Sequence, residues 1–210
     1  MTLANNKKRA RSECEKEARR AEILAAAREM IADAGFDGVT MSGLAKRAGL
    51  AKGTLYLYVR SKEELFLLLY LAALVDYVER FEALTDPDGI AAQMTGAALE
   101  IPLFLPLSAR LVAVIEANVA DAALFAVKRE IGALGGRVVT HLSTLLALTP
   151  DKAAQVMNAL TMAMQGAAQF DITAQRDPDE VPADLRQMFA SHAFARCFPP
   201  AAELILSAVR

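Results

Sequence analysis

The stretch "TMSGLAKRAGLAKGTLYLYVRSKEEL", residues 40–65, carries two short helical patterns with a glycine between them. The first pattern places four apolar residues on one side of a helix over 41–48, namely Met41, Leu44, Ala45 and Ala48. Thr40 is a suitable N-cap for that helix. Gly49 ends the helix and allows the left-handed turn that redirects the chain.

The second pattern begins at Lys52 and buries Leu55 and Val59 on one side of a helix over 52–59. Two short helices joined by a turn of about three or four residues that contains glycine form a helix-turn-helix. In that motif the second helix enters the major groove of DNA. The stretch therefore predicts a unit that binds nucleic acid.

Five residues of the second helix face away from its buried side: Lys52, Gly53, Thr54, Tyr56 and Tyr58. A lysine can reach a phosphate, and a threonine can offer its hydroxyl to a base edge and its methyl to thymine. Glycine costs the helix about 1 kcal/mol relative to alanine, but it removes the side chain that would keep the backbone away from DNA. The phenols can donate hydrogen bonds to phosphates. Alternatively, the tyrosines pack internally and the glycine is incidental.

A further helix is predicted from Ser61, because Ser61 and Glu64 have the spacing of a capping box. Lys62 lies in the first turn, where the helix dipole favours anions. A DNA phosphate at this helix end would explain a lysine there. The alternative is an ordinary solvated lysine.

A first helix over about 17–34 is predicted from apolar residues at helical spacing, and Gly35 ends it. Residues 17–66 are thus expected to form a three-helix DNA-binding domain, with the helix-turn-helix at about 40–59. Residues 1–16 are expected to be a flexible basic arm. Net charge agrees with this division, because residues 1–62 carry 13 Lys+Arg against 7 Asp+Glu, while the whole chain has a net charge of −2.

Composition indicates an all-α protein, because 54% of its residues are hydrophobic and strong helix formers dominate. The longest apolar run, residues 65–75, is shorter than the roughly 20 residues of a membrane span. The chain begins with polar and basic residues, so it is expected to be cytoplasmic. Cys14 and Cys197 have no partner pattern that indicates a disulfide framework or a metal site.

Residues 67–210 predict a helical ligand-binding and dimerisation domain. Cap and proline signals place its helices at about 87–100, 107–119, 121–148, 150–170 and from Pro199 onward. Pro102 and Pro106 are expected to break the chain, and residues 172–182 to form a loop.

A two-fold operator needs two recognition helices one turn of DNA apart, so a homodimer is expected. The helix 150–170 is rich in small residues and methionine, and with 200–209 it is the expected subunit interface. The surroundings of any pocket are apolar, which favours a mostly apolar effector. Five polar residues are candidates to line that pocket: Arg110, Glu116, Asn118, His141 and Gln165. The alternative is that each makes an ordinary helix-to-helix hydrogen bond.

The sequence carries no sign of an enzyme, a cofactor or a metal site. It has two histidines, His141 and His192, without metal-ligand spacing, and no nucleotide-binding or nucleophile motif. One alternative is an all-helical small-molecule carrier or enzyme with a basic N-terminal segment. Another is a non-specific architectural protein, which would lack a preference for one DNA sequence.

Residues 34–66, "AGFDGVTMSGLAKRAGLAKGTLYLYVRSKEELF", resemble the DNA-binding domain of the tetracycline-repressor (TetR) family of bacterial transcriptional regulators. The favoured interpretation of the whole chain is a repressor that binds a palindromic operator as a homodimer and is released by a small, mostly apolar effector. The resemblance implies phosphate contacts by Thr40 and Lys62. It also implies that 52–54 lie at the groove and that both tyrosines touch the DNA backbone. Ala51 departs from the serine that is frequent in the family, so the second helix lacks a side-chain cap.

Overall fold

The structure, a computed structural model, describes residues 3–171 and 180–209. These residues contain helices and no strand, which confirms the predicted all-α class. The chain divides into two compact units, Met1–Leu68 and Leu69–Arg210. Within the described ranges no single helix is long and apolar enough to cross a membrane, although two bent helix pairs pass that test by length and composition alone.

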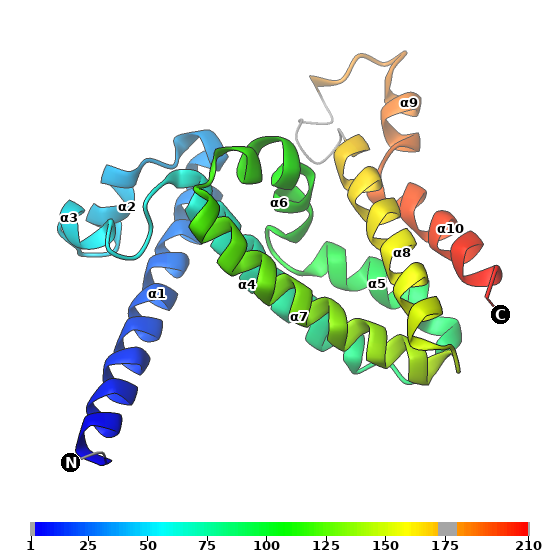
Figure 1. The fold of residues 1–210 in the computed structure, drawn as a ribbon. Coiled ribbons are helices and arrows are strands. Elements are labelled where there is room, and N and C mark those ends of the chain that lie inside the picture. The colour runs from blue at the N-terminus through cyan, green and yellow to red at the C-terminus, as the bar shows by residue number, and fades with distance from the viewer. Residues whose placement is uncertain (1–2, 172–179, 210) are drawn as a thin grey trace. The chain divides into compact units, whose positions relative to one another are not determined.

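The first unit contains α1 (Leu3–Gly38), α2 (Met41–Arg47), α3 (Lys52–Leu55) and the start of α4 (Lys62–Glu82) (Figure 1). Helix α1 begins at Leu3, well before the expected start near residue 17, so the helix includes residues 3–16. Alanine, lysine, arginine and glutamate are common there, and all are strong helix formers. Gly35 has φ 68° and ψ −179°, so the regular helix ends at the predicted glycine.

Helix α3 is shorter than the predicted 52–59. It ends at Leu55, and the chain continues in a turn in which the amides of Tyr58 and Val59 both donate to the Leu55 carbonyl. Ala51 caps this helix without a side-chain hydrogen bond, as expected, and the sequence then places a glycine in its first turn. A helix that lacks a cap and contains glycine has little stability of its own. Burial of Leu55 and Val59, both fully inaccessible, holds the segment in place.

The second unit is built from the remaining helices. They are η1 (Pro87–Gly89), α5 (Ile90–Glu100), α6 (Phe104–Arg110), η2 (Leu111–Ile115), η3 (Glu116–Asn118), α7 (Asp121–Leu145), α8 (Pro150–Phe170), α9 (Arg186–Ser191) and α10 (Phe194–Ser207). Helix α8 lies alongside α10 (Figure 1). Helix α7 runs along α4, to which it is tied by ion pairing between Arg137 and Glu82 and by ring contact between His141 and Phe81.

Cap predictions in this unit are confirmed at two helices. The Asp86 carboxylate accepts from the Asp88 amide at 2.9 Å, and the helical segment that begins at Pro87 ends at Glu100. The Thr149 hydroxyl accepts from the Lys152 amide at 3.4 Å at the start of α8.

Other boundaries differ from the predictions. The expected helix 107–119 is a succession of α-, π- and 3₁₀-helical turns that begins at Phe104. Pro106 does not break the chain, because it lies in the first turn of α6, where no amide hydrogen is needed. The predicted loop 172–182 falls largely on residues 172–179, which lie outside the described ranges.

The last helix begins at Phe194 and not at Pro199, so both prolines lie inside α10. The Phe194 amide, the first of this helix, donates to the buried Asp171 carboxylate at 2.9 Å. This bond takes the place of an N-cap side chain. One face of the helix is completely buried through Phe194, Phe198, Ala202 and Leu206. Packing of that face stabilises the helix despite the two missing amide donors.

Candidate functional site

The segment from Thr40 to Lys62 presents a polar surface on a buried apolar base. Lys52, Gly53 and Thr54 are exposed, Tyr56 is 39% exposed and Tyr58 is half-buried. The side chains beneath them at positions 55 and 59 are fully buried. The five residues that the sequence predicted to face outward therefore do so to different degrees.

Thr40 caps α2, because its side-chain oxygen accepts from the Gly43 amide at 3.1 Å. The hydroxyl hydrogen of Thr40 is not used in that bond, and the residue is exposed. Gly49 has φ 65°, which is the left-handed conformation expected in the turn between α2 and α3. The helix-turn-helix geometry is therefore present at the predicted residues.

The capping box at the start of α4 has an offset geometry. The Glu64 amide donates to the Ser61 hydroxyl at 3.0 Å, as predicted. The Glu64 carboxylate accepts from the Arg60 amide at 2.8 Å, one residue before the usual partner. Lys62 has contacts of its own, since its Nζ is 3.5 Å from the Asp37 carbonyl oxygen and 5.6 Å from the centre of the Phe66 ring.

Leu57 is an exposed apolar residue that the sequence reading did not single out. It is 83% exposed, more than any other large hydrophobic residue in the described part of the chain. The available signal was its position between Leu55 and Val59, which excludes it from the buried side of the turn. Its neighbours in the sequence, Tyr56 and Tyr58, are two of the predicted DNA-facing residues.

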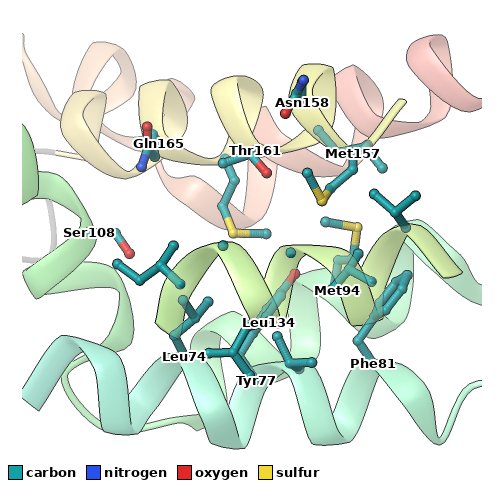
Figure 2. Close-up of a pocket in the computed structure, with 18 of the residues that line it drawn as sticks. Leu74, Tyr77, Phe81, Met94, Ser108, Leu134, Met157, Asn158, Thr161 and Gln165 are labelled. Atoms are coloured by element: carbon teal, nitrogen blue, oxygen red, sulfur yellow. The ribbon is translucent and has the colours of Figure 1, made fainter. Parts of the chain in front are cut away.

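The second unit encloses a cavity of about 420 Å³ lined by residues of α4, α5, α6, η2, α7 and α8. Its walls are largely apolar, and methionine and aromatic side chains reach it from several helices. Figure 2 shows Tyr77 extending from α4 into this space, with Leu134 and Met157 around it. A cavity of this size lies near the lower end of the ~300–1,000 Å³ range of small-molecule sites.

An aromatic stack forms one wall of the cavity. Phe104 lies nearly parallel to Tyr77 at 4.5 Å between ring centres and to Tyr70 at 6.1 Å. Burial raises the pKa of Tyr70 to about 12, against the opposing effect of its hydrogen bond with Ser108. Burial also raises the pKa of Tyr77 well above the ordinary value. Both phenols are therefore neutral at physiological pH.

Of the five polar residues predicted for a pocket, one lines this cavity, namely Gln165. Arg110 donates to the Pro106 carbonyl at 3.0 Å and Asn118 donates to the Val114 carbonyl at 2.8 Å, each one turn back along its own helical segment. His141 contacts the Leu84 carbonyl at 2.9 Å. The polar atoms of these three residues thus bond to nearby main chain, and none of the three lines the cavity.

Glu116 lies beside the cavity without lining it. Its carboxylate is 2.5 Å from Nζ of Lys128, which does line the cavity. The Glu116 side chain is 14% exposed and that of Lys128 is 44% exposed, so the pair joins a half-exposed cation to a mostly buried anion. No group of three potential metal ligands occurs among the described residues.

A helix-turn-helix unit followed by a helical unit with a largely apolar cavity defines a DNA-binding regulator that has room for a small molecule. Two family models match this chain: bacterial regulatory proteins of the tetR family over residues 23–69, and the tetracyclin repressor-like C-terminal domain over residues 69–176. The chain belongs to the TetR family of transcriptional regulators, which confirms the resemblance seen in residues 34–66.

Among curated relatives, the fatty acid metabolism regulator protein of Bacillus subtilis (strain 168) is 39% identical over 61 residues. That match covers 29% of this chain and 31% of the relative, so the chain aligns with less than a third of the relative's length.

Solved structures share the fold along most of the chain. The regulator FadR from Bacillus subtilis, in complex with stearoyl-CoA, matches with a TM-score of 0.54 and 18% identity over 90% of this chain and 99% of that one. A TetR/AcrR-family regulator from Thermobifida fusca matches with a TM-score of 0.53 and 17% identity over 92% and 99%. At sequence identities this low, these structural matches show a common fold and nothing more specific.

Proposed function

We propose that this regulator is a repressor that binds a palindromic operator as a homodimer and leaves it when a mostly apolar effector binds. The observation that carries the proposal is the pairing of an exposed polar helix-turn-helix surface with an apolar cavity in the other unit. The FadR structure supports an apolar effector only by analogy of fold, since its ligand carries a long hydrocarbon chain.

The proposed DNA contacts are of two kinds: contacts to phosphates, which position the protein on the DNA, and contacts to bases, which recognise the sequence. Thr40, Tyr56, Tyr58 and Lys62 bind phosphates, and Lys52 does so at the edge of the groove. Lys62 exchanges its 3.5 Å contact with a carbonyl for a phosphate, which is a stronger partner for a cation. Gly53 provides clearance for the backbone, because a Cβ there would meet no protein atom within 4 Å.

Two residues are proposed to read bases. Thr54 is exposed at the start of the recognition segment, and its hydroxyl and methyl suit a base edge. Leu57 joins it, because an apolar side chain that is 83% exposed in the free chain gains by contact with a thymine methyl.

Helices α8 and α10 are the proposed dimer interface. Met162 and Phe170 on α8 and Leu204 on α10 are large apolar residues that are 72%, 64% and 74% exposed. Apolar residues at such exposure on adjacent helices indicate a protein-protein surface. A dimer would supply the two recognition segments that a two-fold operator requires.

Effector binding is proposed to act through α4. This helix begins in the first unit at Lys62, and its later residues Tyr70, Tyr77 and Phe81 line the cavity. A ligand that binds better to one position of α4 than to another shifts the population of the DNA-binding state.

Selection of bound genomic fragments followed by footprinting tests the proposal. A regulator protects a two-fold site with half-sites about 34–36 Å apart and prefers it over random DNA at physiological salt. A carrier or an enzyme with a basic segment protects none. Sedimentation of the Leu204→Glu variant tests the interface, since a charge there should yield monomers that bind the operator weakly.

A further inference from the structure

Tyr77 presents a hydroxyl group that has no hydrogen-bond partner within the protein. The residue is buried, and its phenol oxygen is one of the inaccessible polar atoms that lack a partner. An unpaired buried polar group destabilises a fold, so most such groups in native proteins are paired. Its burial-raised pKa keeps the phenol protonated, so that its O–H is available to donate into the cavity.

The polar groups around it are already paired or lie toward solvent. Tyr70 is hydrogen-bonded to Ser108. Thr161 and Asn158 on α8 are exposed and Gln165 on the same helix is partly exposed, which places all three toward the open side of the cavity. Tyr77 is therefore the deep polar contact that the cavity offers to a ligand.

The charge around the cavity is balanced. Lys128 is the cationic side chain among the lining residues that the structure describes, and it is paired with Glu116. An anionic ligand group that took Lys128 for itself would leave the mostly buried Glu116 carboxylate without a partner. Breaking such a pair is strongly unfavourable, and so is burying an anion with no counter-charge.

We propose that the cavity takes an uncharged, largely apolar ligand with one hydrogen-bond-accepting oxygen, a carbonyl or a hydroxyl, which accepts from the Tyr77 phenol. This inference rests on the proposed effector site and specifies its chemistry. The group inside the cavity is a ketone, ester, thioester or alcohol and not a free carboxylate. Any charged part of a larger ligand remains outside, past the exposed residues of α8.

The test compares two probes of similar shape on the full-length protein, 2-nonanone and nonanoate at neutral pH, by displacement of the neutral dye Nile red. The ketone should displace the dye at concentrations at least about ten-fold lower than nonanoate, because the carboxylate loses its hydration and finds no free cation. Equal or tighter binding of nonanoate would overturn the inference.

The phenol is tested with Tyr77→Phe. The variant should bind 2-nonanone about five-fold more weakly, as expected for one lost hydrogen bond. It should also melt at a higher temperature, because the unpaired hydroxyl is gone. Ser143→Ala is the matched control, since Ser143 also has a buried hydroxyl without a partner but does not line the cavity. It should melt higher with unchanged affinity for the ketone.

Unchanged ketone affinity in folded Tyr77→Phe shows that another group binds the oxygen and overturns the assignment. If that variant does not fold, the two-probe comparison on the unaltered chain decides. Operator binding measured without any probe separates this inference from the proposed function. If the protein binds its operator normally but the ketone does not displace Nile red, only this inference is overturned. If no operator is found, the proposed function is overturned, and the comparison of the two probes still tests the inference.

Discussion

The two units build their candidate sites in opposite ways. The proposed DNA-binding surface consists of exposed and half-buried side chains from Thr40 to Lys62, within one short stretch of chain. The cavity collects mostly apolar side chains between Tyr70 and Gln165, on helices that are far apart in sequence. The difference teaches that the first site can be altered without touching the core, whereas the second site is itself a part of the core that was left open.

The partners of the polar groups differ in the same way. Around the first site, polar atoms cap helices or face water, as Thr40 and Ser61 show. In the second unit the cavity leaves the Tyr77 hydroxyl buried and unpaired. Truncating an exposed side chain at the first site should therefore change mainly DNA binding, whereas removing the Tyr77 hydroxyl at the second should change stability and ligand binding in opposite directions.

The largest expected effect comes from Leu55→Ala, which attacks the base of the first site. Leu55 is fully buried, so truncation should cost about 2–5 kcal/mol of unfolding free energy and abolish operator binding. Leu57→Ala, two residues away on the exposed side, should change stability by less than about 0.5 kcal/mol. Urea unfolding and mobility shifts measure both. Similar losses of stability in the two variants would contradict the separation of surface from core.

Lys62→Ala should change how operator affinity depends on salt. Each phosphate contact contributes about −0.9 to the slope of log affinity against log salt, so a dimer should lose about two units of slope. Lys152→Ala, an exposed lysine of the second unit, is the control and should leave the slope unchanged. An unaltered slope in Lys62→Ala would show that this lysine keeps its contacts within the protein in the complex.

Glycine replacements give a matched pair in the two units. A Cβ at Gly53 or at Gly136, which lines the cavity on α7, meets no protein atom within 4 Å. Each alanine variant should stabilise the free protein by roughly 0.4–1 kcal/mol. Gly53→Ala should weaken operator binding and spare dye binding, and Gly136→Ala should do the reverse. Thermal melts together with the operator-binding and dye-binding assays measure these effects. A variant that weakens operator binding and dye binding equally would contradict the expectation that each substitution affects only its own site.

Leu57 can be tested as a reader of thymine by removing one methyl group from the DNA. Deoxyuridine in place of the contacted thymidine should weaken operator binding by about 0.8 kcal/mol, the value of one buried methylene. In Leu57→Ala the same change in the DNA should have almost no effect. If deoxyuridine weakens binding equally in both proteins, another residue contacts that methyl group.

The smallest expected effect is at the link between α4 and α7. The hydrogen bond from Arg137 holds the pKa of Glu82 below its ordinary value of 4.5. A lowered carboxyl pKa adds stability that is complete above the ordinary value and is lost as pH falls through the lowered one. Glu82→Gln should thus melt slightly lower at neutral pH, with the difference closing in acid. Adding Arg137→Gln should cause little further loss, and a full additional loss would show that the pair does not act together.

Local signals in the sequence were sufficient for the first unit. Thr40, Gly35, Gly49 and Ser61 were predicted to cap, end or turn helices, and each does so. The prediction was less accurate where stability comes from packing. The recognition helix was predicted to reach residue 59 but ends at Leu55. The residues that follow are held by burial of Val59 and not by helix propensity.

Predictions for the second unit show where local signals end. The prolines predicted that the last helix begins at Pro199, yet it begins at Phe194. Its first turn is stabilised there by buried contacts and by the Asp171 carboxylate. Polar residues in apolar helices read as pocket candidates, yet Arg110, Asn118 and His141 bond to nearby main chain. Tyr77 was not singled out, because a tyrosine on an apolar helix is ordinary until the space in front of its hydroxyl is known.

The sequence by itself determined the helical class, the helix-turn-helix and the resemblance to its family, because helix periods, caps and turn glycines act over a few residues. Only the tertiary structure decided where a cavity opens, which polar groups line it and which of them lack a partner. Those properties depend on side chains that are brought together from α4, α7 and α8, and no spacing along the chain records their distances.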